Sequence, residues 1–182
     1  MTSAKIAQLS TESLVEQIFR QSEGHWNSQR RYYTLKQEVE PQEVVTFLTV
    51  RFLEQGSPEL VELARLHQLD DEGALKFGSE ATWESNYTGK TRKPSQGSTV
   101  FGVRDNIIYR DRGFSTHQPI TATYFCPNPQ TLCLKTEYGK SVFEEELKLI
   151  GENYRTRQTI ILRTGQEQMI GQYLEKRIYL EK

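Results

Sequence analysis

The sequence is poor in cysteine and has no long apolar run, and both absences narrow what the protein can be. Cys126 and Cys133 are too few for a disulfide framework, and with three scattered histidines they give no metal-ligand spacing. No segment reaches the roughly 20 apolar residues of a membrane helix, and the N-terminus has no apolar signal region. We expect a cytoplasmic protein without a metal, whose two cysteines are free thiols or pair across the turn at 127–129.

The chain also lacks an excess of charge of either sign. Its 23 basic and 24 acidic residues give a formal net charge of -1, which does not favour nucleic-acid binding. Its 182 residues are enough for one sizeable core and too few for two ordinary domains. The sequence therefore predicts a single domain over residues 1–182.

Motifs of an enzyme with its own nucleophile are missing as well. The chain has no Gly-x-Ser-x-Gly motif, no glycine-rich phosphate loop and no suggestive spacing of cysteine and histidine. The residues alone indicate a protein that holds a ligand rather than one that attacks it.

Helical periodicity is confined to two segments. The first covers about residues 11–21 and carries an apolar stripe of Leu14, Val15, Ile18 and Phe19. The second begins at Ser57-Pro58-Glu59, which combines an N-cap, a proline at the first helical position and an acid in the first turn. His67, at the end of the second stripe, is expected to be a half-buried structural residue.

Most of the remaining sequence alternates between strand-like runs and turn signals. A polar loop is expected at 88–97. Ten successive antiparallel strands leave exposed edges unless the sheet closes, so we expect a mainly β protein: a barrel of about ten strands with an N-terminal helix and a second short helix. The expected strands cover residues 26–39, 43–54, 74–87, 98–104, 107–114, 119–126, 131–138, 141–150, 153–163 and 167–180.

Alternation along residues 141–150 places one acid among inward-facing apolar side chains. Phe143, Leu147 and Leu149 occupy odd positions, so Glu145 shares the inner face. A carboxylate inside a barrel either pairs with a cation or is favoured in its protonated form. The competing interpretation is a glutamate near a strand end whose side chain turns out to water.

Two arginines share one face of the following strand. Arg155 and Arg157 lie two residues apart, which suits two carboxylates of one ligand, each held by a guanidinium group. Periodicity does not decide whether this face is inside, so an exposed arginine face fits equally well. Trp83 with Glu84, and the segment His25–Arg31, are further candidates, with a core tryptophan and a surface junction as the alternatives.

Several longer segments resemble one known family. They are Ser28–Tyr33, Trp83–Ser85, Gly97–Val103, Tyr109–Phe114, Phe143–Gly151, Tyr154–Thr159 and Met169–Arg177. From about Leu14 to the C-terminus the chain resembles the S-type phycobiliprotein lyases, the CpcS/CpeS family. The resemblance implies a calycin- or lipocalin-like barrel similar to fatty-acid-binding proteins.

The resemblance also implies an activity. A lyase of this family attaches phycocyanobilin or a related bilin, through a thioether bond, to a cysteine of phycobiliprotein subunits of the phycocyanin, allophycocyanin or phycoerythrin type. The bilin is then the substrate, with no prosthetic cofactor. Whether the protein acts alone, as a homodimer or with a second lyase subunit stays open. The implied residues are Glu145 as the catalytic acid, selected by parity within 144–146, and Arg155, Arg157, Trp83, Glu84, His25, Trp26 and Arg30 for bilin binding.

In this interpretation the arginines and the acid bind different groups of the pigment. Arg155 and Arg157 hold the two propionates, Glu145 pairs with protonated pyrrole nitrogens, and Trp83 packs on a ring. Two other classes of protein fit the sequence. A carrier of a fatty acid or another carboxylated hydrophobic ligand would form no adduct, and an assembly partner of light-harvesting complexes would bind no bilin.

Overall fold

The computed structural model describes residues 2–35, 38–87, 94–113, 116–163 and 166–181, and for residues 2–10, 87, 166 and 167 the backbone only. Its helices are α1 (Thr2–Ser22) and α2 (Pro58–Leu66). Its strands are β1 (Gly24–Thr34), β2 (Gln42–Glu54), β3 (Phe77–Tyr87), β4 (Ser95–Arg104), β5 (Ile107–Arg110), β6 (Ile120–Asn128), β7 (Thr131–Tyr138), β8 (Ser141–Ile150), β9 (Tyr154–Arg163) and β10 (Gln166–Ile178).

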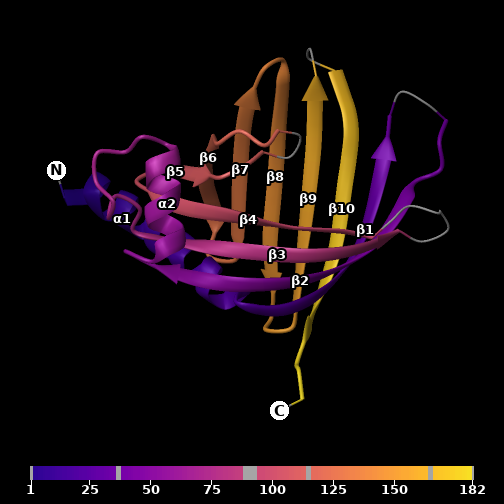
Figure 1. Ribbon diagram of the computed structural model, residues 1–182, viewed down its shortest axis with the longest axis horizontal. Helices are drawn as coiled ribbons and strands as arrows, with labels where there is room; N and C mark the ends of the chain where they lie inside the picture. The colour runs from indigo at the N-terminus through magenta and orange to yellow at the C-terminus, as the bar shows by residue number, and fades with distance from the viewer. Residues whose placement is uncertain (1, 36–37, 88–93, 114–115, 164–165, 182) are drawn as a thin grey trace.

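These strands form a closed barrel in the order β1-β10-β9-β8-β7-β6-β5-β4-β3-β2. Antiparallel pairing of β1 with β10, from His25 opposite Ile178 to Thr34 opposite Met169, joins the first strand to the last. Closure removes the exposed sheet edges. In Figure 1, β7–β10 run nearly vertically, β2–β4 cross them nearly horizontally, and both helices lie at one end of the molecule. The predicted fold class is confirmed.

Helix α1 closes part of one end of the barrel. Its buried residues Val15, Ile18 and Phe19 pack against apolar side chains of β3 to β8. The apolar stripe was predicted correctly, but the predicted start at about residue 11 is wrong, because the helix begins at Thr2. The preceding segment is rich in alanine and other good helix formers, which extend the helix toward the N-terminus.

Gly24 connects α1 directly to β1. Its φ of +132° is a conformation that favours glycine, and a Cβ atom here would lie 2.6 Å from Nη1 of Arg177. Arg177, on β10, donates hydrogen bonds to the carbonyl oxygens of Gln21 and Glu23. The end of the helix is thereby fixed to the last strand.

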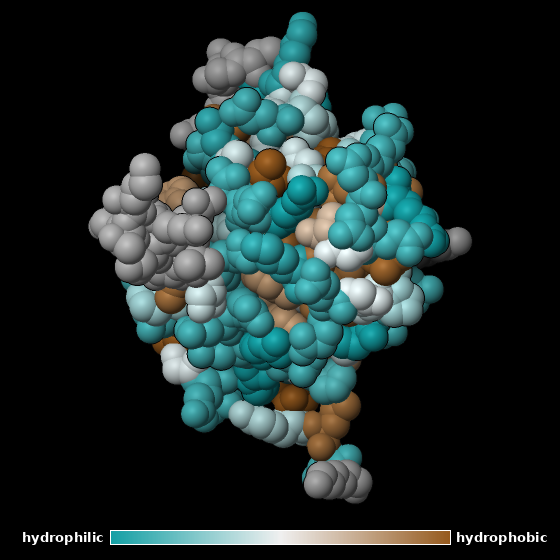
Figure 2. Space-filling view, turned by 90° about the vertical axis from the view of Figure 1, so that its left-hand side faces the viewer, coloured by the Kyte–Doolittle hydropathy of each residue, from teal (hydrophilic) through white to brown (hydrophobic). Residues whose placement is uncertain are grey.

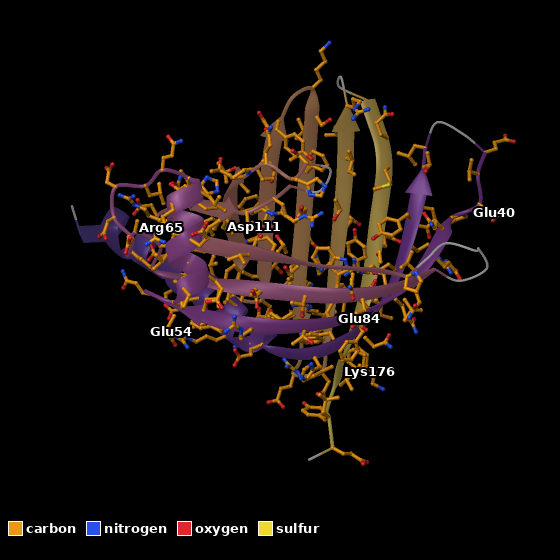
Figure 3. All side chains as sticks on the ribbon, in the orientation of Figure 1. Glu40, Glu54, Arg65, Glu84, Asp111 and Lys176 are labelled. Carbon is orange, nitrogen blue, oxygen red and sulfur yellow. The ribbon has the colours of Figure 1, made fainter. Side chains whose placement is uncertain are left out.

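Strand ends differ from the predicted ones where polar side chains redirect the chain. β5 ends at Arg110 rather than at residue 114, because the carboxylate of Asp111 accepts hydrogen bonds from Thr99 Oγ1 and Val100 N, both at 3.0 Å. Asp111 is labelled in Figure 3. β4 begins at Ser95, inside the predicted loop 88–97, of which residues 88–93 lie outside the described ranges. Likewise β1 ends at residue 34 rather than 39, and residues 36–37 are not described.

Helix α2 packs on the outside of the barrel, where its buried residues Leu60, Leu63 and Ala64 contact Leu53. The face that bears both helices is largely hydrophilic, with apolar residues in small separate areas (Figure 2). His67 is half-buried, as predicted, with its Nε2 atom 2.9 Å from the carbonyl oxygen of Arg110. Neither of the described helices has the length and apolar character needed to cross a membrane.

Replacing Ile18 with alanine tests the closure of the barrel by α1. Ile18 is fully buried, so Ile18→Ala is expected to lower the free energy of unfolding by about 2–4 kcal/mol through lost burial and the cavity left behind. Urea denaturation measures this. Gln17→Ala, on the exposed side of the same helix, is the control and should change stability by less than about 0.5 kcal/mol. Equal effects of the two substitutions would contradict the packing described.

Candidate functional site

The barrel encloses a cavity of about 380 Å³. Apolar side chains such as Leu48, Phe101 and Leu132 form much of its wall, and Phe19 and Ser22 of α1 border one end. Five arginines reach the same cavity: Arg30, Arg110, Arg112, Arg155 and Arg157. A volume in the range of roughly 300–1,000 Å³ and a mostly apolar wall with a few polar groups are typical of a small-molecule site.

Arg155 is buried inside the barrel and paired with an acid on the inward face of β10 that does not itself line the cavity. Its Nε atom donates to Oε1 of Glu175 on β10 at 2.6 Å, and the two side chains are 4% and 0% exposed. The guanidinium also lies over the ring of Trp26, 4.7 Å from its centroid. Burial lowers the pKa of Arg155 to about 10. The neighbouring charge of Arg157 also lowers it, whereas the carboxylate of Glu175 raises it. At neutral pH Arg155 is therefore charged and held rigidly.

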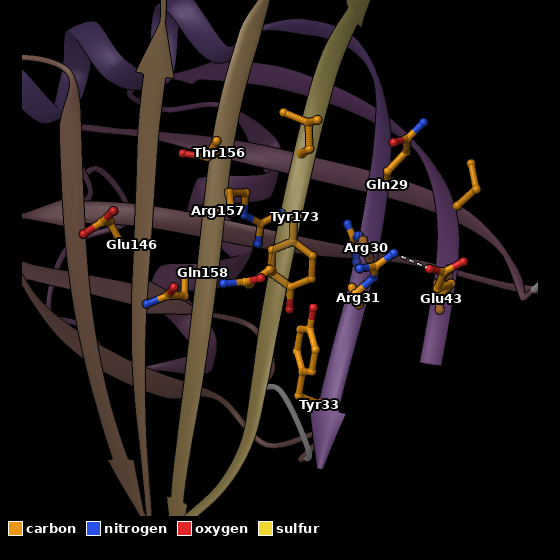
Figure 4. Close-up of a pocket in the computed structure, with 14 residues that line it drawn as sticks. Gln29, Arg30, Arg31, Tyr33, Glu43, Glu146, Thr156, Arg157, Gln158 and Tyr173 are labelled. Atoms are coloured by element: carbon orange, nitrogen blue, oxygen red, sulfur yellow. Dashed lines mark hydrogen bonds and ion pairs between the residues drawn. The ribbon is translucent and has the colours of Figure 1, made fainter. Parts of the chain in front are cut away.

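Arg157 also points inward, but it is far less enclosed. Its side chain is 29% exposed, and its Nη1 atom lies 3.9 Å from Oε2 of Glu175. The guanidinium groups of Arg157 and Arg30 lie 5.2 Å and 4.9 Å from the ring centroid of Tyr173. Figure 4 shows Tyr173 between these two arginines. The tyrosine therefore separates two cationic groups that remain available to a ligand.

Glu145 faces the cavity, as parity predicted, and it meets a cation. Its Oε1 atom accepts a hydrogen bond from Nη1 of Arg110 at 3.2 Å, and the two side chains are 13% and 9% exposed. Arg110 projects from β5, where Asp111 and His67 hold the main chain in place. The acid is thus neutralised by a residue from another wall of the barrel.

Trp83 borders the cavity on β3. Gly97 lies opposite it on β4, and a Cβ atom at that glycine would come within 2.5 Å of the indole. The guanidinium group of Arg112 lies over the ring at 5.6 Å. The absence of a side chain at Gly97 therefore gives the indole its place beside the cavity.

Three other residues predicted for the site do not face the cavity. Trp26 points inward but is fully buried between Arg155 and Arg177, with Nε1 donating to the carbonyl oxygen of Ser22 at 2.9 Å. His25 and Glu84 occupy the opposite parity of their strands: His25 stacks on Phe47 of the outer surface, and Glu84 is exposed. These two side chains therefore do not line this cavity, because adjacent residues of a strand point to opposite faces.

Four residues of the site were missed by the sequence reasoning: Arg110, Arg112, Tyr173 and Glu175. Alternation along β10 does place Tyr173 and Glu175 on one face, and the register sets Glu175 opposite Arg155. The sequence alone gives no such register. Arg110 had a weaker signal, because it shares the parity of Ile108 in a strand of only four residues.

A second depression of about 680 Å³ lies over β8, β9, β10, β1 and β2 (Figure 4). Most of the residues that line it are polar, and they include Gln29, Gln158, Gln172 and the ion pair of Arg31 with Glu43. Arg30 and Arg157 border both this depression and the inner cavity. We place the candidate site in the inner cavity, because the apolar wall and the buried charges are there.

Comparison with known proteins identifies the family. A family model described as CpeS-like protein matches residues 14–178. The chain belongs to the CpeS-like family. A protein of Nostoc sp. (strain PCC 7120) named "Putative phycocyanobilin lyase CpcS 2" is 55% identical over 175 residues, which are 96% of this chain and 97% of that protein.

Two further relatives of this CpeS-like chain support the assignment and the fold. "Putative chromophore lyase CpcV" of Picosynechococcus sp. is 49% identical over 161 residues, covering 88% of this chain and 80% of that protein. The solved structure of the S-type phycobiliprotein lyase CPES from Guillardia theta matches with a TM-score of 0.72 over 92% of this chain and 93% of that one. Because its sequence identity is 17%, this last match supports the fold alone.

Replacing Glu175 tests the buried pair. Glu175→Gln leaves Arg155 charged and buried without its partner, so we expect the free energy of unfolding at pH 7 to fall by about 3–5 kcal/mol. Chemical denaturation measures the change. Glu152→Gln, at an exposed position, is the matched control and should be neutral. A neutral effect of Glu175→Gln would show that the pair contributes nothing to the barrel.

The same pair predicts a pH dependence. Burial favours a higher pKa for Glu175, but Arg155 and then Arg157 outweigh it, and the pKa lies below the usual 4.5. An acid whose pKa is lowered by folding stabilises the fold at a pH above its pKa in the unfolded chain. This contribution is lost as the pH falls through its pKa in the folded protein. We expect wild-type stability to decline below pH 4.5 more steeply than that of Glu175→Gln, as measured by denaturation at a series of pH values. Parallel declines would contradict this.

Proposed function

We propose that this protein is a chromophore lyase, which holds phycocyanobilin or a related bilin in its barrel and attaches it to a cysteine of a phycobiliprotein subunit. The observation that carries the proposal is the charge around the cavity. Five arginines line the cavity, together with Glu145 and Glu146, and Glu175 pairs with Arg155, which leaves a surplus of two positive charges. A bilin is an elongated aromatic molecule with two propionates. Its charge complements that surplus, and its skeleton suits the apolar wall.

The difference in exposure among the arginines suggests that they have different roles. Arg157 and Arg30 face the cavity on either side of Tyr173, and they are placed to bind the propionates directly. Arg155 is committed to Glu175, so its role is to hold the positive end of the cavity in shape. Trp83 offers a flat surface for a pyrrole ring. The expectation that Glu145 stabilises a protonated pigment stays a prediction, and because Arg110 neutralises this acid we expect a modest effect.

The chemistry requires no nucleophile from the barrel. The thiol of the acceptor protein adds across the ethylidene double bond of ring A: a carbon–sulfur bond forms, the π electrons take up a proton, and no group leaves. The barrel supplies orientation and keeps other nucleophiles away. Its own thiols compete poorly, because burial raises the pKa of Cys126 to about 11 and raises that of Cys133.

In this proposal the bilin is a substrate and not a prosthetic group, and the partners are phycobiliprotein subunits of the phycocyanin, allophycocyanin or phycoerythrin type. The names of the Nostoc and Picosynechococcus relatives support it. A cytoplasmic location, and action as a homodimer or with a second lyase subunit, stay predictions from the sequence.

Co-expression with a bilin-producing system and an acceptor subunit tests the activity. We expect an acceptor whose bilin stays attached after acid denaturation and whose absorbance matches a natively coloured subunit. A matched sample without the protein controls for spontaneous attachment. A coloured barrel with no adduct on the acceptor would instead indicate a carrier, and a colourless barrel would remove the bilin from the account.

Arg157→Gln tests the propionate site. Loss of a charged hydrogen-bond donor is expected to weaken binding of free phycocyanobilin about tenfold or more, as followed by absorbance titration. Arg31→Gln, on the outer face of β1, makes the same chemical change outside the inner cavity and should bind as wild type. Unchanged affinity of the Arg157 variant would exclude Arg157 from the propionate site.

A further inference from the structure

The guanidinium group of Arg110 has a hydrogen-bond donor without an acceptor. The residue is 7% exposed and borders the cavity. Its Nη1 atom donates to Glu145, while its Nε atom is enclosed without a partner among the residues that the structure describes. Buried polar groups are nearly always satisfied, and a buried charge that lacks acceptors is costly. The open Nε donor therefore points to an acceptor that a ligand supplies.

Arg110 is held firmly where it can meet such a ligand. It pairs with Phe101 on one side and Ile120 on the other, and its guanidinium lies 4.8 Å from the ring centroid of Phe101. The carbonyl oxygen of Arg110 is bound by His67, the residue that follows α2. These contacts come from β4, β6 and the end of α2, so a small movement would not bring a protein acceptor to the free Nε–H group.

The ion pair of Arg110 with Glu145 gives little net attraction for a charged group. Each partner largely cancels the charge of the other, so a carboxylate at Arg110 or a cation at Glu145 is attracted only weakly. The pair is neutral as a unit and offers N–H donors beside a carboxylate acceptor. The complementary group is uncharged and carries an acceptor next to a donor. A lactam has this pattern, because its carbonyl oxygen and N–H lie side by side.

We propose that Arg110 and Glu145 together bind a terminal lactam ring of the bilin. Arg110 donates to the lactam oxygen, and Glu145 accepts from the lactam N–H. This rests on the proposed function, in which Arg157 and Arg30 take the propionates. The propionates belong to the two central rings and leave the end rings free to move. The Arg110–Glu145 pair fixes one end ring, and so sets the depth at which the pigment lies in the barrel.

Esterification of the propionates separates the two kinds of contact. Affinities are measured by absorbance titration for phycocyanobilin and for its dimethyl ester, whose lactams are unchanged. The proteins are wild type, Arg110→Lys, Arg157→Gln and Arg104→Lys, the last being an exposed control that makes the same change near β5. Arg110→Lys keeps the charge beside Glu145 but loses the planar fork of donors.

We expect Arg110→Lys to weaken the binding of both ligands by the same factor, about tenfold. Arg157→Gln should weaken the binding of the free acid only. Arg104→Lys should bind both ligands as wild type. A loss by Arg110→Lys that is confined to the free acid would make Arg110 a propionate ligand and overturn the proposal, and so would no loss with either form. Failure of wild type to bind either form would instead count against the proposed function itself.

A second measurement uses wild-type protein alone and so does not depend on the folding of a variant. Phycocyanobilin O-methylated at the lactam of ring A, and separately of ring D, lacks the N–H donor at that ring. One of the two ethers should bind about tenfold more weakly than the parent and the other nearly as well. Equal binding of both ethers and the parent would overturn the proposal.

Discussion

The cavity depends on one buried interaction, the ion pair of Arg155 with Glu175 between β9 and β10. Both side chains are almost completely enclosed, and the guanidinium lies over the ring of Trp26. A buried charge is tolerated only with a partner. Removal of either residue would leave the other buried and unpaired, at a high cost in stability. Because the strands that carry the pair also carry Arg157 and Tyr173, its integrity sets the geometry of the whole positive wall.

Two different electrostatic environments share this barrel. Near β9, β10 and β1 the arginines exceed the acids, which favours an anionic ligand. Across the cavity, Arg110 and Glu145 form a pair that is neutral as a whole but has an unpaired donor, Nε of Arg110. A pigment with charged groups in its middle and neutral lactams at its ends would find a matching environment for each. The barrel needs no nucleophile of its own, because its contribution is to hold the pigment in one orientation for a thiol that another protein supplies.

The sequence predicted the strands, the two helices and the inward face of β8, because these depend on local periodicity. Closure into a barrel was inferred from the need to remove exposed sheet edges. Glu145 was placed inside since its apolar neighbours mark the face. The direction of Arg155 could not be decided in the same way, because both faces of β9 mix polar and apolar residues. The partners Glu175 and Arg110 depend on strand register and barrel closure, which no local pattern reports. Glu84 was grouped with Trp83 through adjacency, although neighbours in a strand face opposite sides.

The crystal structure of the protein with bound phycocyanobilin tests the central claim most directly. The account predicts the tetrapyrrole inside the barrel, with propionate oxygens within hydrogen-bond distance of Arg157 or Arg30 and the Arg155–Glu175 pair intact. A pigment seated in the outer depression over β9 and β10, or one whose propionates extend into solvent away from all the cavity arginines, would contradict it.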